Sequence, residues 1–222
     1  MEKKAVLENL FPVWNKLDAE QRESLLCASS QVNIKQGTVL QDASSECRGL
    51  YLIESGRLRA FIISETGKEI TLYRLFNRDL CLFTATCMMK NIQFDMSVEA
   101  ERDTRMLIIP VKVYQNLMEK SAVLANFTNE IMASRFSEVM WLLDKVMFKG
   151  IDSRLASFLI EESLIEGEQT LFVTQERIAG HIGTAREVIT RMLKYFQDEG
   201  AVRLFRGGIE ITDAKKLSAL SK

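Results

Sequence analysis

The chain has 222 residues, of which 47% are hydrophobic and 27% are charged, and its formal net charge is −1. This composition is that of a globular protein and excludes a disordered or fibrous chain, while the length predicts two modest domains at about 100 to 200 residues each. The near-neutral charge argues against a protein that coats nucleic acid regardless of sequence, although it leaves room for a local basic patch.

Residues 1 to about 28 are predicted to be helical, because apolar residues recur there at helical spacing. Asp18 is placed to cap a second short helix, AEQRESLLCA. The N-terminus has no apolar run followed by small residues, so it does not read as a signal peptide. No segment approaches about 18 consecutive apolar residues, the length that a membrane span needs. We therefore expect a cytoplasmic protein with no membrane span.

From Val32 the hydrophobic pattern changes to a period of two. Short runs rich in Val, Ile, Leu, Tyr and Phe alternate with turn residues: VNIK, TVL, GLYLIE, RLRAFII and KEITLYRL, followed by FDMSVEA and RMLIIP. Gly56 and Gly67 are expected in hairpin turns, and Pro110 ends the region because it cannot donate to a strand ladder. Strands this short and this evenly spaced predict an all-β barrel or sandwich.

Residues 111 to about 148 contain no Gly or Pro and are predicted to form one long helix. Its apolar residues follow each other in steps of three and four, at Leu124, Phe127, Ile131, Phe136, Met140, Leu143 and Met147. Such a stripe fits a helix that packs on its own barrel, and it also fits the seam of a coiled-coil dimer. Lys149-Gly150 ends the helix, and Asp152 is a good N-cap for the next one. We place the domain boundary there, with one domain at 1–148 and the other at 149–222.

The segment TQERIAGHIGTAREVITRMLKYFQDEG predicts two helices that meet across a tight turn. The first begins at Thr174 and ends at Gly183; the second is capped by Thr184, with Glu187 completing a capping box, and runs to Gly200. A small residue, a turn glycine and an apolar anchor are needed where the helices meet, and Ala179, Gly183 and Ile189 supply them. AVRLF, RGG and IEIT then form a strand, a turn and a strand, so the segment predicts a winged helix-turn-helix.

The exposed face of the second helix is predicted to carry Arg186, Glu187, Thr190 and Arg191. Arg reads guanine, Glu can accept from cytosine, and Thr can contact phosphate or a thymine methyl group. The alternative is that Glu187 only caps the helix and pairs with Arg191; within a winged helix-turn-helix we favour DNA binding. His181, the single histidine, is expected to be a surface or phosphate-facing residue. No nucleophile, base and orienting group can be assembled around it, so we do not expect an enzyme.

Four cysteines, Cys27, Cys47, Cys81 and Cys87, are scattered without a CxxC pair. This spacing fits a reducing compartment and predicts no disulfide framework and no structural zinc. Cys81 and Cys87 lie near each other in the chain. We consider them buried small apolar residues, with redox sensing as the alternative.

A barrel, a long helix and a winged helix-turn-helix, in this order, resemble the CRP/FNR family of bacterial transcription regulators. The resemblance covers nearly the whole chain, through YLIESGRLRAFIISETGKEITLYRL in the N-terminal half and GIDSRLASFLI followed by VTQERIAGHIGTAREVITRMLKYFQDEGAV in the C-terminal half. It implies an α+β fold with an N-terminal β-roll of the jelly-roll or double-stranded β-helix type, a long dimerisation helix and a C-terminal winged helix-turn-helix.

The resemblance also implies a homodimer that places two recognition helices on a near-palindromic site in double-stranded DNA, with RNA polymerase as a candidate partner. The Arg, Glu and later Arg that read a TGA-containing half-site in the family fall on Arg186, Glu187 and Arg191. Thr190-Arg191 is also similar to the Ser-Arg of the FNR branch, which leaves the half-site open. The residues expected at the DNA, the first two of them at phosphates, are Thr174, Gln175, Thr184, Arg186, Glu187, Thr190 and Arg191.

The effector site departs from the family pattern. Members that bind cyclic AMP have a Gly-Glu and an Arg-Ser, where this chain has Phe83-Thr84 and Phe94-Asp95. An aspartate in place of the arginine repels phosphate, so we do not expect cyclic AMP binding in the usual way. The cysteines do not match the ligands of an iron–sulfur cluster, and the single histidine lies in the wrong domain for haem.

The effector is therefore unassigned, and three alternatives stay open. The first is an apolar or aromatic ligand, for which the candidate pocket residues are Phe83, Thr84, Phe94, Asp95, Val139 and Met140. The second is a thiol response through Cys81 and Cys87. The third is a ligand-binding module of the cyclic-nucleotide type that regulates a protein partner without touching DNA.

Overall fold

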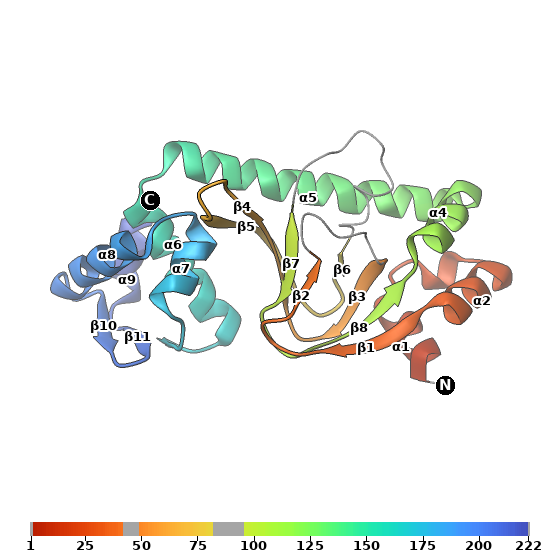
Figure 1. The fold of residues 1–222 in the computed structure, drawn as a ribbon, viewed down its shortest axis with the longest axis horizontal. Coiled ribbons are helices and arrows are strands. Elements are labelled where there is room, and N and C mark those ends of the chain that lie inside the picture. Colours follow the sequence, from red (N-terminus) through yellow and green to blue (C-terminus); the bar gives the residue numbers. More distant parts are fainter. Residues whose placement is uncertain (1, 42–48, 82–95, 222) are drawn as a thin grey trace. The chain divides into compact units, whose positions relative to one another are not determined.

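The computed structural model describes residues 2–41, 49–81 and 96–221 (Figure 1). Its residues fall into two compact units, the first made of Met1–Phe61 and Leu72–Val139, the second of Ile62–Thr71 and Met140–Lys222. The division falls inside a helix, upstream of the boundary that we expect at Lys149-Gly150. Outside the described residues lie the predicted site residues Phe83, Thr84, Cys87, Phe94 and Asp95.

The first unit begins with two α-helices and a short 3-10 helix. They are α1 (Glu2–Leu10), η1 (Trp14–Lys16) and α2 (Ala19–Ala28). The predicted cap at Asp18 is confirmed: its carboxylate accepts a hydrogen bond of 2.8 Å from the Gln21 backbone, and the Gln21 side chain accepts one of 3.3 Å from the Asp18 backbone. These helices cover a core to which Leu7, Trp14, Leu50 and Leu107 all belong.

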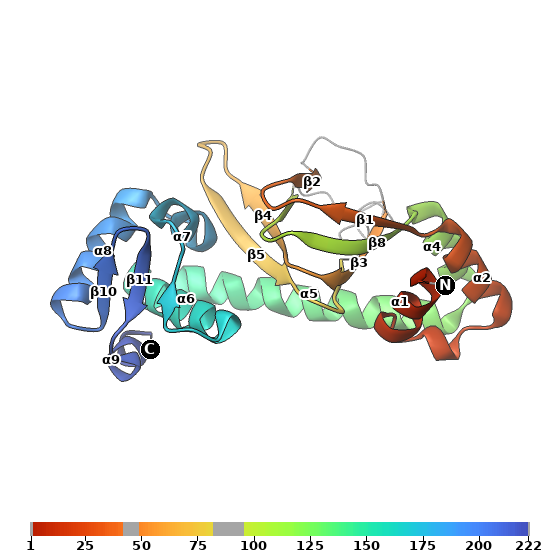
Figure 2. The same ribbon diagram turned by 90° about the horizontal axis from the view of Figure 1, so that it is seen from below.

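Two four-stranded sheets follow (Figures 1 and 2). Their strands are β1 (Ser30–Ile34), β2 (Val39–Gln41), β3 (Leu50–Ser55), β4 (Leu58–Ile63), β5 (Glu69–Leu75), β6 (Leu80–Cys81), β7 (Ser97–Ala100) and β8 (Thr104–Ile109). The orders are β1-β8-β3-β6 and β2-β7-β4-β5, with antiparallel pairing wherever the register is defined. The predicted strands and the α+β fold are confirmed; the two-residue β6 is an addition.

Both predicted turn glycines have the left-handed backbone that a side chain disfavours. Gly56 has φ of 102° between β3 and β4, and Gly67 has φ of 77° between β4 and β5. A Cβ atom on Gly56 would lie 2.5 Å from the Asp103 carbonyl oxygen, so this turn has no room for any other residue.

The second sheet carries ion pairs that the alternating pattern of RLRAFII does not reveal. Arg59 is buried and places Nη1 3.1 Å from Glu99 Oε1 on the neighbouring strand. Arg57 and Arg74 each place Nε 3.0 Å from Glu101 Oε2, which is also buried. Buried charges persist only when they are paired, so these contacts hold the strands in register.

The stretch 111–148 is two helices, which corrects the prediction of one. α4 (Val111–Lys120) and α5 (Ala122–Phe148) are separated by Ser121, whose backbone is extended. The Ser121 carbonyl accepts from the Ala125 backbone, and its hydroxyl accepts from the Leu124 backbone at 3.4 Å, so Ser121 begins a new helix. None of the helices in the described ranges combines the length and the apolar character that crossing a membrane requires.

The second unit is built on α6 (Ile151–Glu166), with α7 (Gln175–Ile182), α8 (Arg186–Asp198) and α9 (Ala214–Leu220) packed around it. A small antiparallel sheet has the order β10-β11-β9, with β9 at Thr170–Leu171, β10 at Val202–Phe205 and β11 at Gly208–Ile211. The predicted winged helix-turn-helix is confirmed, with β9 and α9 added.

The cap of α6 differs from the prediction. Gly150 is the N-cap, and Asp152 lies within the first turn of the helix. The Gly150 carbonyl accepts from the Arg154 backbone, so the helix starts before Asp152 can cap it. In the first turn its carboxylate still interacts favourably with the helix dipole.

Candidate nucleic-acid interface

The two helices of the helix-turn-helix meet as the spacing predicts. Thr174 caps α7, accepting a 3.1 Å hydrogen bond from the Arg177 backbone, and Gly183 ends it with φ of 73°. Ala179 and Ile189 are buried in the core of the second unit. The turn therefore fixes α8 on α7 through backbone geometry and packing.

The N-cap of α8 is Ala185 rather than the predicted Thr184, and the predicted capping box with Glu187 is absent. The Gly183 and Thr184 backbone N–H groups both donate to the Ala179 carbonyl, so Thr184 is used to close α7. No side chain in the described part of the chain caps the first turn of α8. The free N–H groups of this turn are consequently open to an anion, such as a phosphate.

The predicted reading face is exposed. Arg186, Glu187, Thr190 and Arg191 are all on the solvent side of α8, while Ile189 and Leu193 on the other side are buried. Glu187 neither caps the helix nor forms an ion pair with Arg191 in the described residues. The two contacts that would explain these side chains as a merely solvated face are thus both missing.

One contact between the helices was not predicted. The Thr190 hydroxyl on α8 lies 2.5 Å from Oε1 of Gln175, the first residue of α7, and 3.0 Å from the Arg186 carbonyl. Both side chains were expected at the DNA, but fifteen positions separate them in the chain, so no sequence pattern indicates that they touch. Only the packing of the two helices brings them together.

The wing, the hairpin of β10 and β11, carries two arginines, Arg203 and Arg206. β10 and β11 pair antiparallel, and Arg203 donates from Nε to Glu210 Oε2 at 2.6 Å within this hairpin. Arg206 is exposed at the turn, next to Gly207 with φ of 88°. Arg203 is therefore engaged within the hairpin, and Arg206 is the arginine at its tip.

His181 is buried, which corrects its expected place at the surface. The residue is 6% exposed, and its ring stacks on Phe158 with 5.1 Å between ring centroids and places Nδ1 2.8 Å from the Thr71 hydroxyl. Thr71 belongs to the same compact unit. The ring thus fills a packing position between α7, to which His181 belongs, and Phe158 of α6. The sequence pattern that could have indicated this burial is the pair of apolar residues Ile178 and Ile182 close to His181 in the same helix.

Two of the predicted effector-pocket residues are described. Val139 is partly buried on α5, and Met140 is 45% exposed. Tyr73 is a titratable group of β5. Burial and the nearby Cys81 raise its pKa well above the ordinary value, and the Arg135 guanidinium lies 4.9 Å from the centroid of its ring. Since the other pocket residues lie outside the described ranges, the pocket stays a prediction.

The described thiols are poorly suited to react. A hydrogen bond to Glu23 and the charge of that carboxylate raise the pKa of Cys27, which keeps it protonated although it is exposed. Cys81 is fully buried in β6, opposite Tyr51 of β3. Because reactive cysteines combine access with a lowered pKa, neither is favoured as a sensor.

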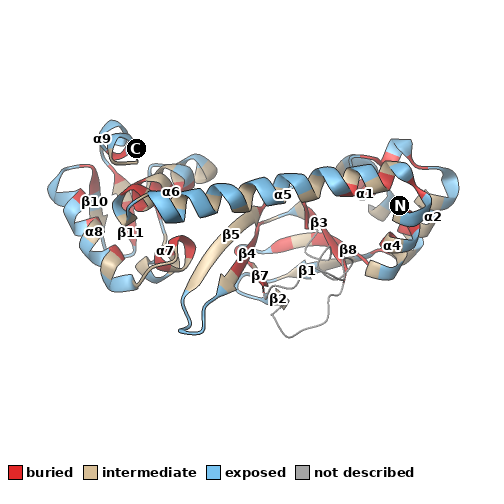
Figure 3. Ribbon diagram, turned by 90° about the horizontal axis from the view of Figure 1, so that it is seen from above, coloured by how far each residue is buried: buried red, intermediate tan, exposed pale blue. Residues whose placement is uncertain are grey.

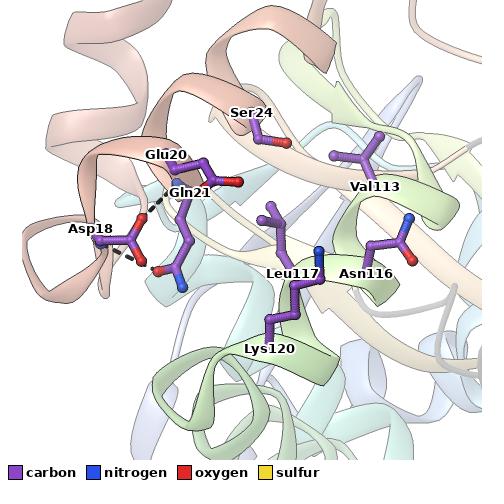
Figure 4. A pocket seen from close by; sticks show the side chains of 8 residues that line it. All are labelled: Asp18, Glu20, Gln21, Ser24, Val113, Asn116, Leu117 and Lys120. Atoms are coloured by element: carbon purple, nitrogen blue, oxygen red, sulfur yellow. Dashed lines mark hydrogen bonds between the residues drawn. The ribbon is translucent and has the colours of Figure 1, made fainter.

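A groove of about 390 Å³ lies between α2 and α4 (Figure 4). Its lining residues are Asp18, Glu20, Gln21, Ser24, Val113, Asn116, Leu117 and Lys120. Asp18 and Gln21 are bound to each other in the capping box at one end of it. Neither of the two described effector candidates, Val139 and Met140, lines this groove, which lies where α2 packs on α4.

Two parts of the chain match known domain families: residues 31–121 match the cyclic nucleotide-binding domain, and residues 153–220 match the Crp-like helix-turn-helix domain. The chain is 29% identical over 175 residues to the Cyclic AMP receptor protein of Thermus thermophilus, covering 78% of this chain and 80% of that protein. It is 30% identical over 202 residues to the Anaerobic regulatory protein of Aggregatibacter actinomycetemcomitans, covering 85% and 75%.

Solved structures agree over the same extent. A candidate transcriptional regulator of the CRP/FNR family from Eubacterium rectale is 50% identical, with a TM-score of 0.93 and coverage of 96% of this chain and 99% of that one. The c-di-GMP responsive regulator CLP of Xanthomonas campestris has a TM-score of 0.73 at 16% identity, covering 87% and 99%, which indicates a likeness of fold alone.

Proposed function

The chain belongs to the CRP/FNR family of DNA-binding transcription regulators, and we propose that it binds a near-palindromic DNA site as a homodimer. The observation that carries this proposal is the exposed face of α8. It holds two arginines, a glutamate and a threonine. Among the described residues, Glu187 does not cap the helix, and it forms no ion pair with Arg191. A two-fold dimer would place two such helices about 34 Å apart, in successive major grooves.

The side chains of this face suit contacts with base edges, and the start of α8 and the wing suit contacts with phosphates. Arg186 and Arg191 offer bidentate donors to guanine O6 and N7, and Glu187 offers an acceptor to cytosine N4. To the first turn of α8, which has no side-chain cap, and to exposed Arg206 on the wing we assign contacts with phosphates, which would fix the register of the protein on the duplex.

The test is a binding titration on a site selected from random DNA. Arg186→Ala and Arg191→Ala should each lose about 1 to 3 kcal/mol of specific binding and accept other bases at one position of each half-site. Lys215→Ala, which removes a cation from exposed α9, is the matched control and should keep specificity. Full discrimination in both arginine variants would contradict the proposed reading face.

The apolar stripe of α5 supports the homodimer. Its N-terminal part packs on its own unit, since Leu124 is buried and Phe127 and Ile131 contact the core. Its C-terminal part is exposed, as Figure 3 shows along this helix, at Phe136 (67%), Met140 (45%), Leu143 (46%) and Met147 (64%). Those four recur in steps of four, three and four residues, the spacing of a coiled-coil seam. A second copy of α5 is the partner that such a seam fits.

For the effector we propose a ligand other than a cyclic nucleotide bound in the usual way. The support is the charge argument at Phe94-Asp95 and Phe83-Thr84, and the burial of Cys81 speaks against a thiol response. A mass spectrum and an ultraviolet-visible spectrum of anaerobically purified protein would separate a bound small molecule, haem, a cluster and bare thiols. Tight cyclic AMP binding by calorimetry would contradict the proposal. A direct role for RNA polymerase stays a prediction.

A further inference from the structure

We propose that Gln175 reads the DNA together with Thr190, as a donor whose orientation is set before binding by the Thr190 hydroxyl. This inference rests on the proposed function and adds to it a coupling between two residues that contact the DNA. Gln175 would then recognise an acceptor, either a phosphate oxygen or a base edge such as guanine O6 or thymine O4. Thr190 would read through its methyl group.

The geometry defines which atoms remain for DNA. The Thr190 hydroxyl lies 2.5 Å from Gln175 Oε1 and 3.0 Å from the Arg186 carbonyl oxygen, and both of these atoms can only accept. The single hydroxyl proton of Thr190 is therefore directed into the protein. Thr190 is exposed on the reading face, and since its hydroxyl proton is engaged, the contact that we assign to it is that of its methyl group with the C5 methyl of thymine.

The same contact orients the amide of Gln175. With Oε1 bound to Thr190, the NH2 group is the free end of the side chain, and it has no hydrogen-bond partner among the described residues. An amide NH2 carries two donors and no acceptor, so it selects groups that accept. Gln175 is the first residue of α7, on the same side of the motif as Thr190, because the two side chains touch.

Fixing the amide in advance has an energetic consequence. A free glutamine on a surface loses rotamer freedom when it binds, and this cost weakens the contact that it makes. Here the rotamer is already selected by a short hydrogen bond between α7 and α8. Removing the Thr190 hydroxyl should thus weaken DNA contacts made by Gln175, although Gln175 itself is unchanged.

A double-mutant cycle tests this coupling on the DNA site selected by the wild-type protein. Thr190→Val keeps the branched shape and a methyl group but loses the hydroxyl; it should weaken binding about 3- to 10-fold, the effect of one hydrogen bond. Gln175→Ala should weaken binding by a similar factor in the wild-type background, and by less than 2-fold when Thr190→Val is already present. Fully additive losses, or no loss with Gln175→Ala, would overturn the inference.

A second substitution separates the methyl group from the hydroxyl. Thr190→Ser keeps the hydroxyl and hence the hold on Gln175, so Gln175→Ala should retain its full effect in this background. Thr190→Ser should also lose any preference for thymine over uracil at one position of the half-site, because uracil lacks the C5 methyl group. A wild-type preference for thymine over uracil that Thr190→Ser leaves intact would overturn the role of the methyl group.

Failure of the inference and failure of the proposed function give different results. If the wild-type protein selects no DNA sequence, the proposed function is wrong. If it selects a site and Arg186→Ala relaxes it while the Gln175 and Thr190 losses add, only the inference is wrong. Thermal melts of every variant establish that α7 and α8 remain folded.

Discussion

Substituting the N-cap of α8 should stabilise the protein and weaken its DNA binding at the same time. Ala185 has φ of −86° and ψ of 147°, the extended backbone that Ser and Asp adopt at helix N-caps. Ala185→Asp can therefore accept from the free N–H groups of the first turn without any change in the chain path. Those are the N–H groups that the proposed function assigns to a phosphate.

The two effects can be estimated separately. Replacing alanine by a capping residue gains about 1 kcal/mol of folding free energy, which for a unit of about 90 residues raises the melting temperature by about 4 to 8 °C. At the DNA, the aspartate removes a charged hydrogen bond and adds a like charge about 4 Å from the phosphate. Together these should cost about 2 to 3 kcal/mol, or roughly 30- to 150-fold in affinity.

Calorimetric melts and gel-shift titrations at one fixed salt concentration measure both effects. Ala185→Ser is the matched control, because it caps without a charge and can release its hydroxyl to a phosphate; it should gain similar stability with less than a tenfold change in affinity. If Ala185→Asp binds DNA as tightly as wild type, the first turn of α8 does not face a phosphate. If it gains no stability, the first turn is already capped in another way.

Three further outcomes follow from the structure. If the protein forms the proposed homodimer, Leu143→Glu should make it a monomer in sedimentation experiments, because the substitution places two charges at the proposed seam. Ser134 is exposed on another side of α5, so Ser134→Glu should leave the oligomeric state unchanged. Gly183→Ala should lower the free energy of unfolding by about 1 to 2 kcal/mol in urea titrations, since φ there is 73°; unchanged stability would mean that the turn can adjust. Burial raises the pKa of Tyr73, so the neutral phenol contributes to the free energy of unfolding. This contribution is complete below the ordinary tyrosine pKa and is lost as pH rises above about 10. Tyr73→Phe should therefore lose less stability than wild type between pH 8 and pH 10.5, and equal losses would contradict this sign.

The parts of the site that depend on short-range spacing could be predicted from the sequence. Thr174 as a cap, Gly183 as the turn and Ile189 as the anchor all follow from three- to six-residue spacings within one motif, and the structure confirms each. The N-cap of α8 was predicted one position too early, at Thr184, because this residue lies both at the end of α7 and just before α8. Its N–H closes α7, and a sequence pattern does not say which helix prevails.

The remaining features depend on contacts between distant segments. Burial of His181 against Phe158, and the bond between Gln175 and Thr190, exist only once the helices have packed. The break at Ser121 was missed for a different reason, since serine is tolerated inside helices and breaks one only when its side chain and carbonyl start the next. The effector site lies largely on residues outside the described ranges, so its chemistry still rests on the sequence.

The single histidine offers a way to observe the motif in solution. His181 stacks on the Phe158 ring beneath α7, so its imidazole protons lie within the magnetic field of that ring. With one histidine in the chain, these protons give one set of signals in a proton NMR spectrum, and no isotope labelling is needed to assign them. Their chemical shifts would follow the docking of α7 on α6 as DNA, effector or temperature is changed.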